Sequence, residues 1–144
     1  MKKKIKNKVK SLKEKHGTTN PFELCNYLNI SILYNDLGNI KGIYQNADKV
    51  PIIHLNSNLS YHDQLYTCAH ELGHAIFHSS LNTVFLEKKT FFLKNKYENE
   101  ANFFAVELLL NNIALDFSLD STITLERISQ ISGIPLNYLE LFFN

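Results

Sequence analysis

The chain has 144 residues, of which 44% are hydrophobic and 20% charged, and its formal net charge is +1. These values are typical of one globular domain with an apolar core, and no apolar run approaches the roughly 20 residues of a membrane-spanning helix. No apolar segment with a cleavage site follows the basic N-terminus, so the two cysteines, Cys25 and Cys68, are expected to be reduced thiols. We therefore expect a cytoplasmic protein with a single domain over residues 1–144 and no membrane partner.

Positive charge is concentrated at the N-terminus. Residues 1–15 hold eight of the fifteen Lys and Arg residues and a single acidic residue, so the rest of the chain is acidic. Ile5, Val9 and Leu12 follow helical spacing, which predicts an amphipathic basic helix over residues 1–16 with its lysines in water. Such a segment can bind nucleic acid or anionic lipid, but a solvated helix face is the commoner role.

A short helix and a small sheet are predicted next. Asn20 is a candidate N-cap with Pro21 at the first helical position, and this helix should reach about Leu28. From Ile30 to Leu55 the runs ISILYN, GIYQ and VPIIHLN are rich in Ile, Val and Tyr and are separated by residues typical of turns. They predict a small, mostly antiparallel sheet of three strands.

Helices dominate the rest of the prediction. Ser60 predicts the start of one long helix, and a second runs from about Tyr97 to Leu110, with an irregular or partly stranded connection between them. Residues 121–144 predict a C-terminal helical pair broken at Gly133. We therefore predict an α+β fold in which the sheet packs with these two long helices, with extra helices at both ends.

The stretch TCAHELGHAIFH at 67–78 contains an HExxH motif. Residues four apart lie on one face of a helix, so His70 and His74 can bind one zinc ion. Glu71 projects from the adjacent azimuth, close enough to act as a general base on a water at the metal without ligating it. A buried helix with two merely satisfied histidines is the weaker interpretation, because an imidazole in an apolar stretch needs a partner. His78 lies too far along the axis for a ligand, and we expect an outer or surface role.

A catalytic zinc needs a third protein ligand from another element. The downstream segment KYENEANFFAVELLL offers three glutamates, Glu98, Glu100 and Glu107. Glu100 shares a face with Phe104 and Leu108, whereas Glu98 points about 160° away around the helix and is expected to lie in water. Glu107 is two turns further along. The predicted metal ligands are therefore His70, His74 and Glu100.

The pairing of TCAHELGH at 67–74 with ENEANFFAVELL at 98–109 resembles the ImmA/IrrE family of metallo-endopeptidases, in particular its short phage and mobile-element members. The resemblance spans roughly Pro21 to Leu110. It implies a zincin-like metallopeptidase domain that is gluzincin-like, in which a glutamate is the third metal ligand. By this resemblance His70 and His74 match the histidine ligands, Glu71 matches the general base, and Glu100 matches the carboxylate ligand.

The resemblance also implies a function. It indicates a zinc-dependent endopeptidase, with one Zn2+ per chain or Mn2+ in its place, that cleaves a helix-turn-helix transcriptional repressor of a phage or mobile element and so acts as an antirepressor. We expect an extended substrate to bind along the strand Pro51–Asn56, directly before the motif helix.

Two alternatives remain open. One is a non-catalytic antirepressor that acts by binding alone. The other is a DNA-binding regulator with a structural metal site, suggested by the stretch ISQISGIPLNYL, which resembles a helix-turn-helix. Direct nucleic-acid binding is disfavoured because residues 121–144 contain Arg127 as their single basic residue, a poor surface for phosphates.

Overall fold

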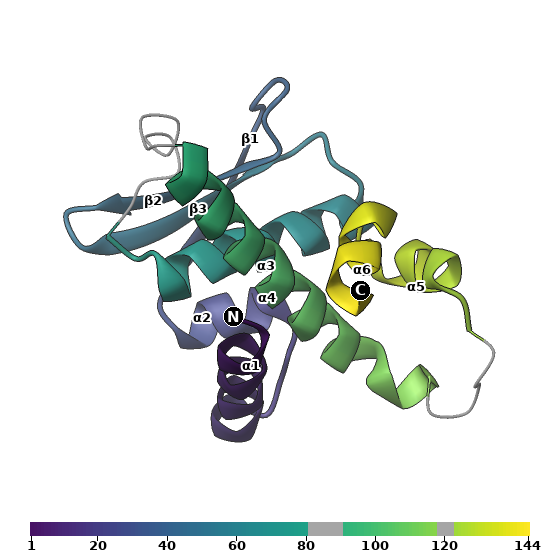
Figure 1. The fold of residues 1–144 in the computed structure, drawn as a ribbon. Coiled ribbons are helices and arrows are strands. Elements are labelled where there is room, and N and C mark those ends of the chain that lie inside the picture. Colours follow the sequence, from purple (N-terminus) through teal and green to yellow (C-terminus); the bar gives the residue numbers. More distant parts are fainter. Residues whose placement is uncertain (81–90, 118–122) are drawn as a thin grey trace.

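The computed structural model describes residues 1–80, 91–117 and 123–144, and within them it has six helices and three strands (Figure 1). The predicted α+β class is confirmed. Part of the predicted irregular connection, at 81–90, and the first residues of the predicted C-terminal segment lie outside the described residues. In chain order the elements are α1 (Lys2–His16), α2 (Pro21–Tyr27), β1 (Ser31–Asn35), β2 (Gly42–Ala47), β3 (Val50–Asn56), α3 (Tyr61–Phe77), α4 (Phe91–Phe117), α5 (Leu125–Ser132) and α6 (Leu136–Phe143).

The three strands form one mixed sheet in the order β1-β3-β2. β3 pairs in parallel with β1, with Ser31 opposite Ile52, and antiparallel with β2, with Gly42 opposite Leu55. Three strands were predicted correctly, but one of the two pairings is parallel, because β3 is inserted between two strands that are consecutive in the chain. The expectation that substrate binds along Pro51–Asn56 is wrong, since β3 is the central strand and both of its edges are already paired.

Helix α3 contacts the sheet on one side and α4 on another. Helix α4 crosses α3 at an angle (Figure 1). Gly73 of α3 lies at this crossing. A Cβ atom there would be 3.1 Å from the Cα of Ala101 and 3.2 Å from Cδ1 of Phe104, both on α4. The missing side chain therefore allows the two helices to approach closely.

Helix α4 is longer than predicted at both ends. The prediction ran from about Tyr97 to Leu110, whereas the helix spans Phe91–Phe117. No Gly or Pro occurs in this range, so the residues themselves supply no signal that stops the helix.

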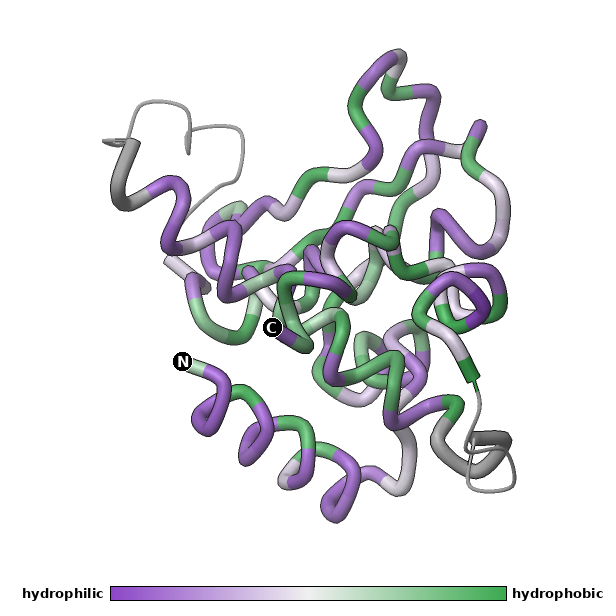
Figure 2. Tube along the Cα trace, turned by 45° about the vertical axis from the view of Figure 1, so that its right-hand side comes forward, coloured by the Kyte–Doolittle hydropathy of each residue, from purple (hydrophilic) through white to green (hydrophobic). Residues whose placement is uncertain are grey.

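The basic helix α1 packs on α4. Ile5, Val9 and Leu12 are its buried residues, and Figure 2 shows the remainder of the helix as mostly hydrophilic. Gly17 ends the helix in the left-handed conformation at φ 73°, and its N–H donates to the carbonyl of Lys13. An apolar stripe thus holds a lysine-rich helix against the helix that carries the candidate carboxylates.

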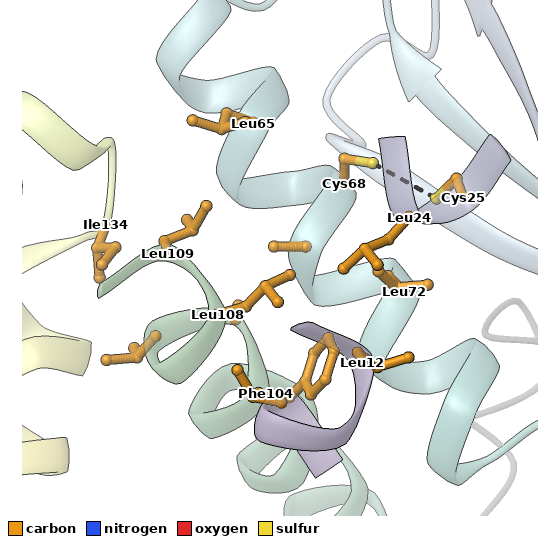
Figure 3. Close-up of a cluster of buried hydrophobic side chains, with 14 of the residues drawn as sticks. Leu12, Leu24, Cys25, Leu65, Cys68, Leu72, Phe104, Leu108, Leu109 and Ile134 are labelled. Atoms are coloured by element: carbon orange, nitrogen blue, oxygen red, sulfur yellow. Dashed lines mark hydrogen bonds between the residues drawn. The ribbon is translucent and has the colours of Figure 1, made fainter. Parts of the chain in front are cut away.

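An apolar core fills the space where α1, α2, α3 and α4 meet (Figure 3). Leu12, Leu72 and Phe104 lie in it and are almost fully buried. Cys25 of α2 and Cys68 of α3 are also buried there as free thiols, with their sulfur atoms 3.9 Å apart. The core thereby packs α3 against both α2 and α4.

The C-terminal helices α5 and α6 pack against α4 and against each other. As predicted, they are separated at Gly133, which adopts φ 81° and lies against the backbone of His62. Within residues 1–80, 91–117 and 123–144, no helix combines the length and apolar character needed to span a membrane.

Candidate metal centre

Helix α3 positions the HExxH residues. It begins after Ser60, whose hydroxyl accepts a hydrogen bond from the backbone N–H of Asp63 at 3.3 Å. His70 and His74 lie one turn apart on it, with ring centroids 4.9 Å apart. Both rings face α4, since each contacts a carboxylate of that helix.

That carboxylate belongs to Glu98. Its Oε2 lies 3.2 Å from Nε2 of His70, and its Oε1 lies 3.0 Å from Nε2 of His74. One donor atom from each of the three residues lies within 4.8 Å of the other two. Ligands of a tetrahedral zinc ion, at 2.0–2.2 Å from the metal, are about 3.3 Å from one another. The nitrogen-to-oxygen distances therefore fit a metal between these side chains after small adjustments.

Glu100 lies elsewhere. Its Oε1 is 3.3 Å from Nε2 of His78, and its Oε2 is 3.0 Å from Nζ of Lys4. Glu107 lines a separate cavity with Lys6 and Lys10 of α1. The structure thus departs from the predicted ligand set at one position, where Glu98 takes the place expected for Glu100.

Glu98 takes this place because α3 approaches α4 most closely on the side of α4 that carries Glu98. The prediction chose the most apolar face, and Glu100 is indeed buried there. The closest approach, however, is made by small residues, with Ala101 against Gly73, and Glu98 lies three residues before Ala101 on the same stripe. Asn102, a polar residue inside the apolar run ANFFAVELL and one turn after Glu98, was the sequence signal for this side.

Asn102 orients the first histidine. Its Oδ1 accepts from Nδ1 of His70 at 2.7 Å and from the hydroxyl of Tyr66 at 3.0 Å. A histidine that donates from Nδ1 can bind a metal through Nε2, the nitrogen that here hydrogen-bonds the carboxylate of Glu98. Sequence analysis did not identify Asn102, although a buried amide of this kind needs polar partners.

Glu71 is buried beside the two histidines. The backbone N–H of Tyr44, on β2, hydrogen-bonds its carboxylate, and Gly42 of the same strand packs against its side chain. Its Oε2 is buried and has no hydrogen-bond partner among the described residues. Burial raises the pKa of Glu71, although the nearby histidines act to lower it. A carboxylate with one uncommitted oxygen is suited to accept a proton at this position.

Histidines and carboxylates in the cluster stabilise each other's charged forms, whereas the two carboxylates, Glu71 and Glu98, repel each other. Burial acts to lower the pKa of His70, but the hydrogen bond to Glu98 and the negative charge of Glu71 outweigh burial and the pKa is raised. Burial acts to raise the pKa of Glu98, but its hydrogen bonds to His70 and His74 hold it well below the usual value. Glu98 is therefore an ionised acceptor, as a metal ligand must be.

His78 has a role that the sequence only hinted at. It is buried, and its Nδ1 lies 2.9 Å from Nδ1 of His74. The ring of Tyr97 packs on it with centroids 4.5 Å apart. It contacts the back of a candidate ligand, which matches an outer role and not a surface one.

Two histidines one turn apart, an acidic residue between them and a carboxylate from the next helix are the groups used by HExxH metallopeptidases. Comparison with known proteins gives the same class. Residues 25–137 match the family model for the IrrE N-terminal-like domain, Peptidase_M78. The chain belongs to this family, and it is a metallopeptidase of the ImmA/IrrE type, so the resemblance noted in the sequence is confirmed.

Two relatives match nearly the whole chain. One is the "Uncharacterized immunity region protein 2" of Bacillus phage phi105, which is 39% identical over 138 residues, covering 95% of this chain and 87% of that protein. The other is "Metallopeptidase ImmA" of Bacillus subtilis strain 168, which is 38% identical over 142 residues, covering 97% of this chain and 78% of that protein.

Proposed function

We propose that the protein is a zinc-dependent endopeptidase that cleaves a helix-turn-helix transcriptional repressor of a phage or mobile element. The observation that carries the proposal is the convergence of His70, His74 and Glu98 beside the buried carboxylate of Glu71. The two relatives add context, since one is named as a metallopeptidase and the other as a protein of a phage immunity region.

In this proposal His70, His74 and Glu98 hold one metal ion through two imidazole nitrogens and a carboxylate. Such a donor set suits Zn2+, with Mn2+ as an alternative. The bound metal would supply Lewis-acid polarisation of the scissile carbonyl and would lower the pKa of a water at the site.

Glu71 performs the proton transfers. Its Oε2 has no partner among the described residues and can accept a proton from the attacking water, whose oxygen forms a bond to the peptide carbonyl carbon. When the carbon–nitrogen bond breaks, Glu71 returns that proton to the leaving amine. The hydrogen bond from the backbone of Tyr44 leaves the carboxylate fixed between the sheet and α3 during both transfers.

The substrate is a protein segment in extended conformation. β2 is an edge strand of the sheet and its Tyr44 reaches Glu71, so an extended peptide beside β2 would pass close to the base. We infer that the partner is the repressor and not its DNA. Residues 121–144 include the stretch that resembles a helix-turn-helix, but their single basic residue, Arg127, makes them a poor surface for phosphates. Since a transcriptional repressor acts in the cytoplasm, we expect cleavage there.

Co-expression with the repressor encoded beside this protein tests the proposal. We expect full-length repressor to disappear and a defined fragment to appear with the wild type and with Glu140→Gln, an exposed control in α6. Glu71→Gln should leave the repressor intact. Relief of repression without any fragment, equal in wild type and Glu71→Gln, would overturn the proposal in favour of an antirepressor that acts by binding alone.

A further inference from the structure

A line of four side chains leads from the solvent-exposed N-terminal helix to the second histidine of the cluster. Nζ of Lys4, on α1, lies 3.0 Å from Oε2 of Glu100. The other oxygen of Glu100 lies 3.3 Å from Nε2 of His78, and Nδ1 of His78 lies 2.9 Å from Nδ1 of His74. Lys4 lies before residues 25–137, the part of the chain that the family model matches.

The donors and acceptors along this line can be assigned in order. The ammonium of Lys4 favours the ionised carboxylate of Glu100, which can only accept. His78 must then donate from Nε2, and its Nδ1 is left as an acceptor. When a metal is bound, His74 must in turn donate from Nδ1, and the lone pair of its Nε2, the nitrogen that here hydrogen-bonds Glu98, is left for the metal. One ammonium thereby specifies a single tautomer of a candidate ligand.

Burial makes this assignment effective. Glu100, His78 and His74 are all buried, with exposed fractions of 5%, 6% and 1%. Water therefore competes little for their hydrogen bonds, and an unmatched donor or acceptor there is costly. Lys4 is the exposed end of the line, and its ammonium also lies over the ring of Phe77, 4.8 Å from the centroid.

We propose that Lys4, Glu100 and His78 are positioning residues that hold His74 in its metal-binding tautomer and orientation, which makes the N-terminal helix part of the metal centre. The inference rests on the proposed function only in taking His74 as a ligand. It also gives a specific role to one lysine of a helix whose charge otherwise suggests only a solvated surface. Outer partners of histidine ligands commonly alter metal affinity by about 10- to 100-fold.

Zinc affinity of the purified full-length protein, measured by competition with a chromophoric chelator, tests the proposal. His78→Leu removes the acceptor for His74, whereas His78→Asn places an amide oxygen near the position of Nδ1. Lys4→Met removes the ammonium and keeps the aliphatic chain, and Lys4→Arg restores a cation. Lys8→Met is the matched control, because Lys8 is an exposed lysine one turn further along α1.

We expect His78→Leu to weaken zinc binding by about 10- to 100-fold and His78→Asn to recover part of that loss. Lys4→Met should lose less than about tenfold, Lys4→Arg should approach wild type, and Lys8→Met should equal it. In the zinc-loaded protein the Nδ1 proton of His74 should resonate downfield in wild type and in Lys8→Met, as a hydrogen-bonded proton does, and should move upfield in His78→Leu, a change that a merely structural role of His78 would not give.

Failure of this inference can be distinguished from failure of the proposed ligand set. If the wild type binds zinc and His74→Ala does not, but Lys4→Met matches Lys8→Met and His78→Leu matches wild type, the inference fails while the metal site stands. If His74→Ala binds zinc as tightly as wild type, the proposed ligand set itself fails. Because Lys4 is exposed, its variants should fold even where a His78 variant does not, and thermal unfolding of the metal-free proteins checks this.

Discussion

Gly73 of α3 is in direct contact with Ala101 of α4, with only 3.1 Å between an ideal Cβ at Gly73 and the Cα of Ala101. This contact lies between His70 and His74 in sequence and three residues after Glu98. It sets how far the histidines are from the carboxylate, because each group is attached to its helix within one turn of the crossing. The spacing of the candidate metal centre is therefore determined by two of the smallest residues in the chain.

A methyl group at position 73 should loosen the site. In Gly73→Ala the new Cβ would press on the backbone of Ala101 and the ring of Phe104. The overpacking cost, about 1–3 kcal/mol, should exceed the gain in helix propensity of about 0.5–1 kcal/mol. We expect lower stability in denaturant unfolding and weaker zinc binding. Unchanged zinc affinity, or a more stable variant, would show that the crossing does not control the cluster.

The amide of Asn102 should contribute to metal affinity through His70. Asn102→Leu removes the acceptor for Nδ1 of His70 and for the hydroxyl of Tyr66, whereas Asn102→Asp keeps an acceptor in place. We expect zinc binding to weaken by about 10- to 100-fold in Asn102→Leu and much less in Asn102→Asp. Equal affinities for the two variants in a chelator competition would contradict an orienting role.

The buried carboxylate of Glu71 should reduce the stability of the metal-free protein. Its Oε2 has no partner among the described residues, and a buried, partly paired charge disfavours folding. We expect Glu71→Gln to raise the free energy of unfolding of the metal-free protein by on the order of 1 kcal/mol. Calorimetry of metal-free wild type and variant measures this, and a clear loss of stability in the variant would mean that the carboxylate is well paired.

Much of the fold could be predicted from the sequence because its signals are local. The spacing of Ile5, Val9 and Leu12, the N-cap at Asn20 and the helix break at Gly133 each depend on a few neighbouring residues. The partner order of the strands depends on contacts distant in sequence, so the insertion of β3 between β1 and β2 had no local signal. The end of α4 was equally hidden, since nothing between Leu110 and Phe117 stops a helix.

The candidate site shows the same division. The HExxH spacing singled out His70, Glu71 and His74 as candidates, because four residues make about one helical turn. The choice between Glu98 and Glu100 depended on which side of α4 meets α3. Apolar character alone favoured Glu100, whereas the close approach of Gly73 to Ala101 favours Glu98. Both glutamates contact this group of histidines: Glu98 faces His70 and His74, and Glu100 contacts His78, which lies behind His74.

The most direct test of this account is the metal content of Glu98→Gln and Glu100→Gln after equilibrium dialysis against low zinc, measured beside wild type. The two substitutions remove the same charge two residues apart on one helix, and a glutamine at 100 still offers an oxygen to His78. We predict one zinc per chain in wild type, little or none in Glu98→Gln, and a metal content in Glu100→Gln that is much closer to wild type, because Glu100 acts on the metal only through His78 and His74. Zinc retained by Glu98→Gln and lost by Glu100→Gln would contradict the ligand set at its centre.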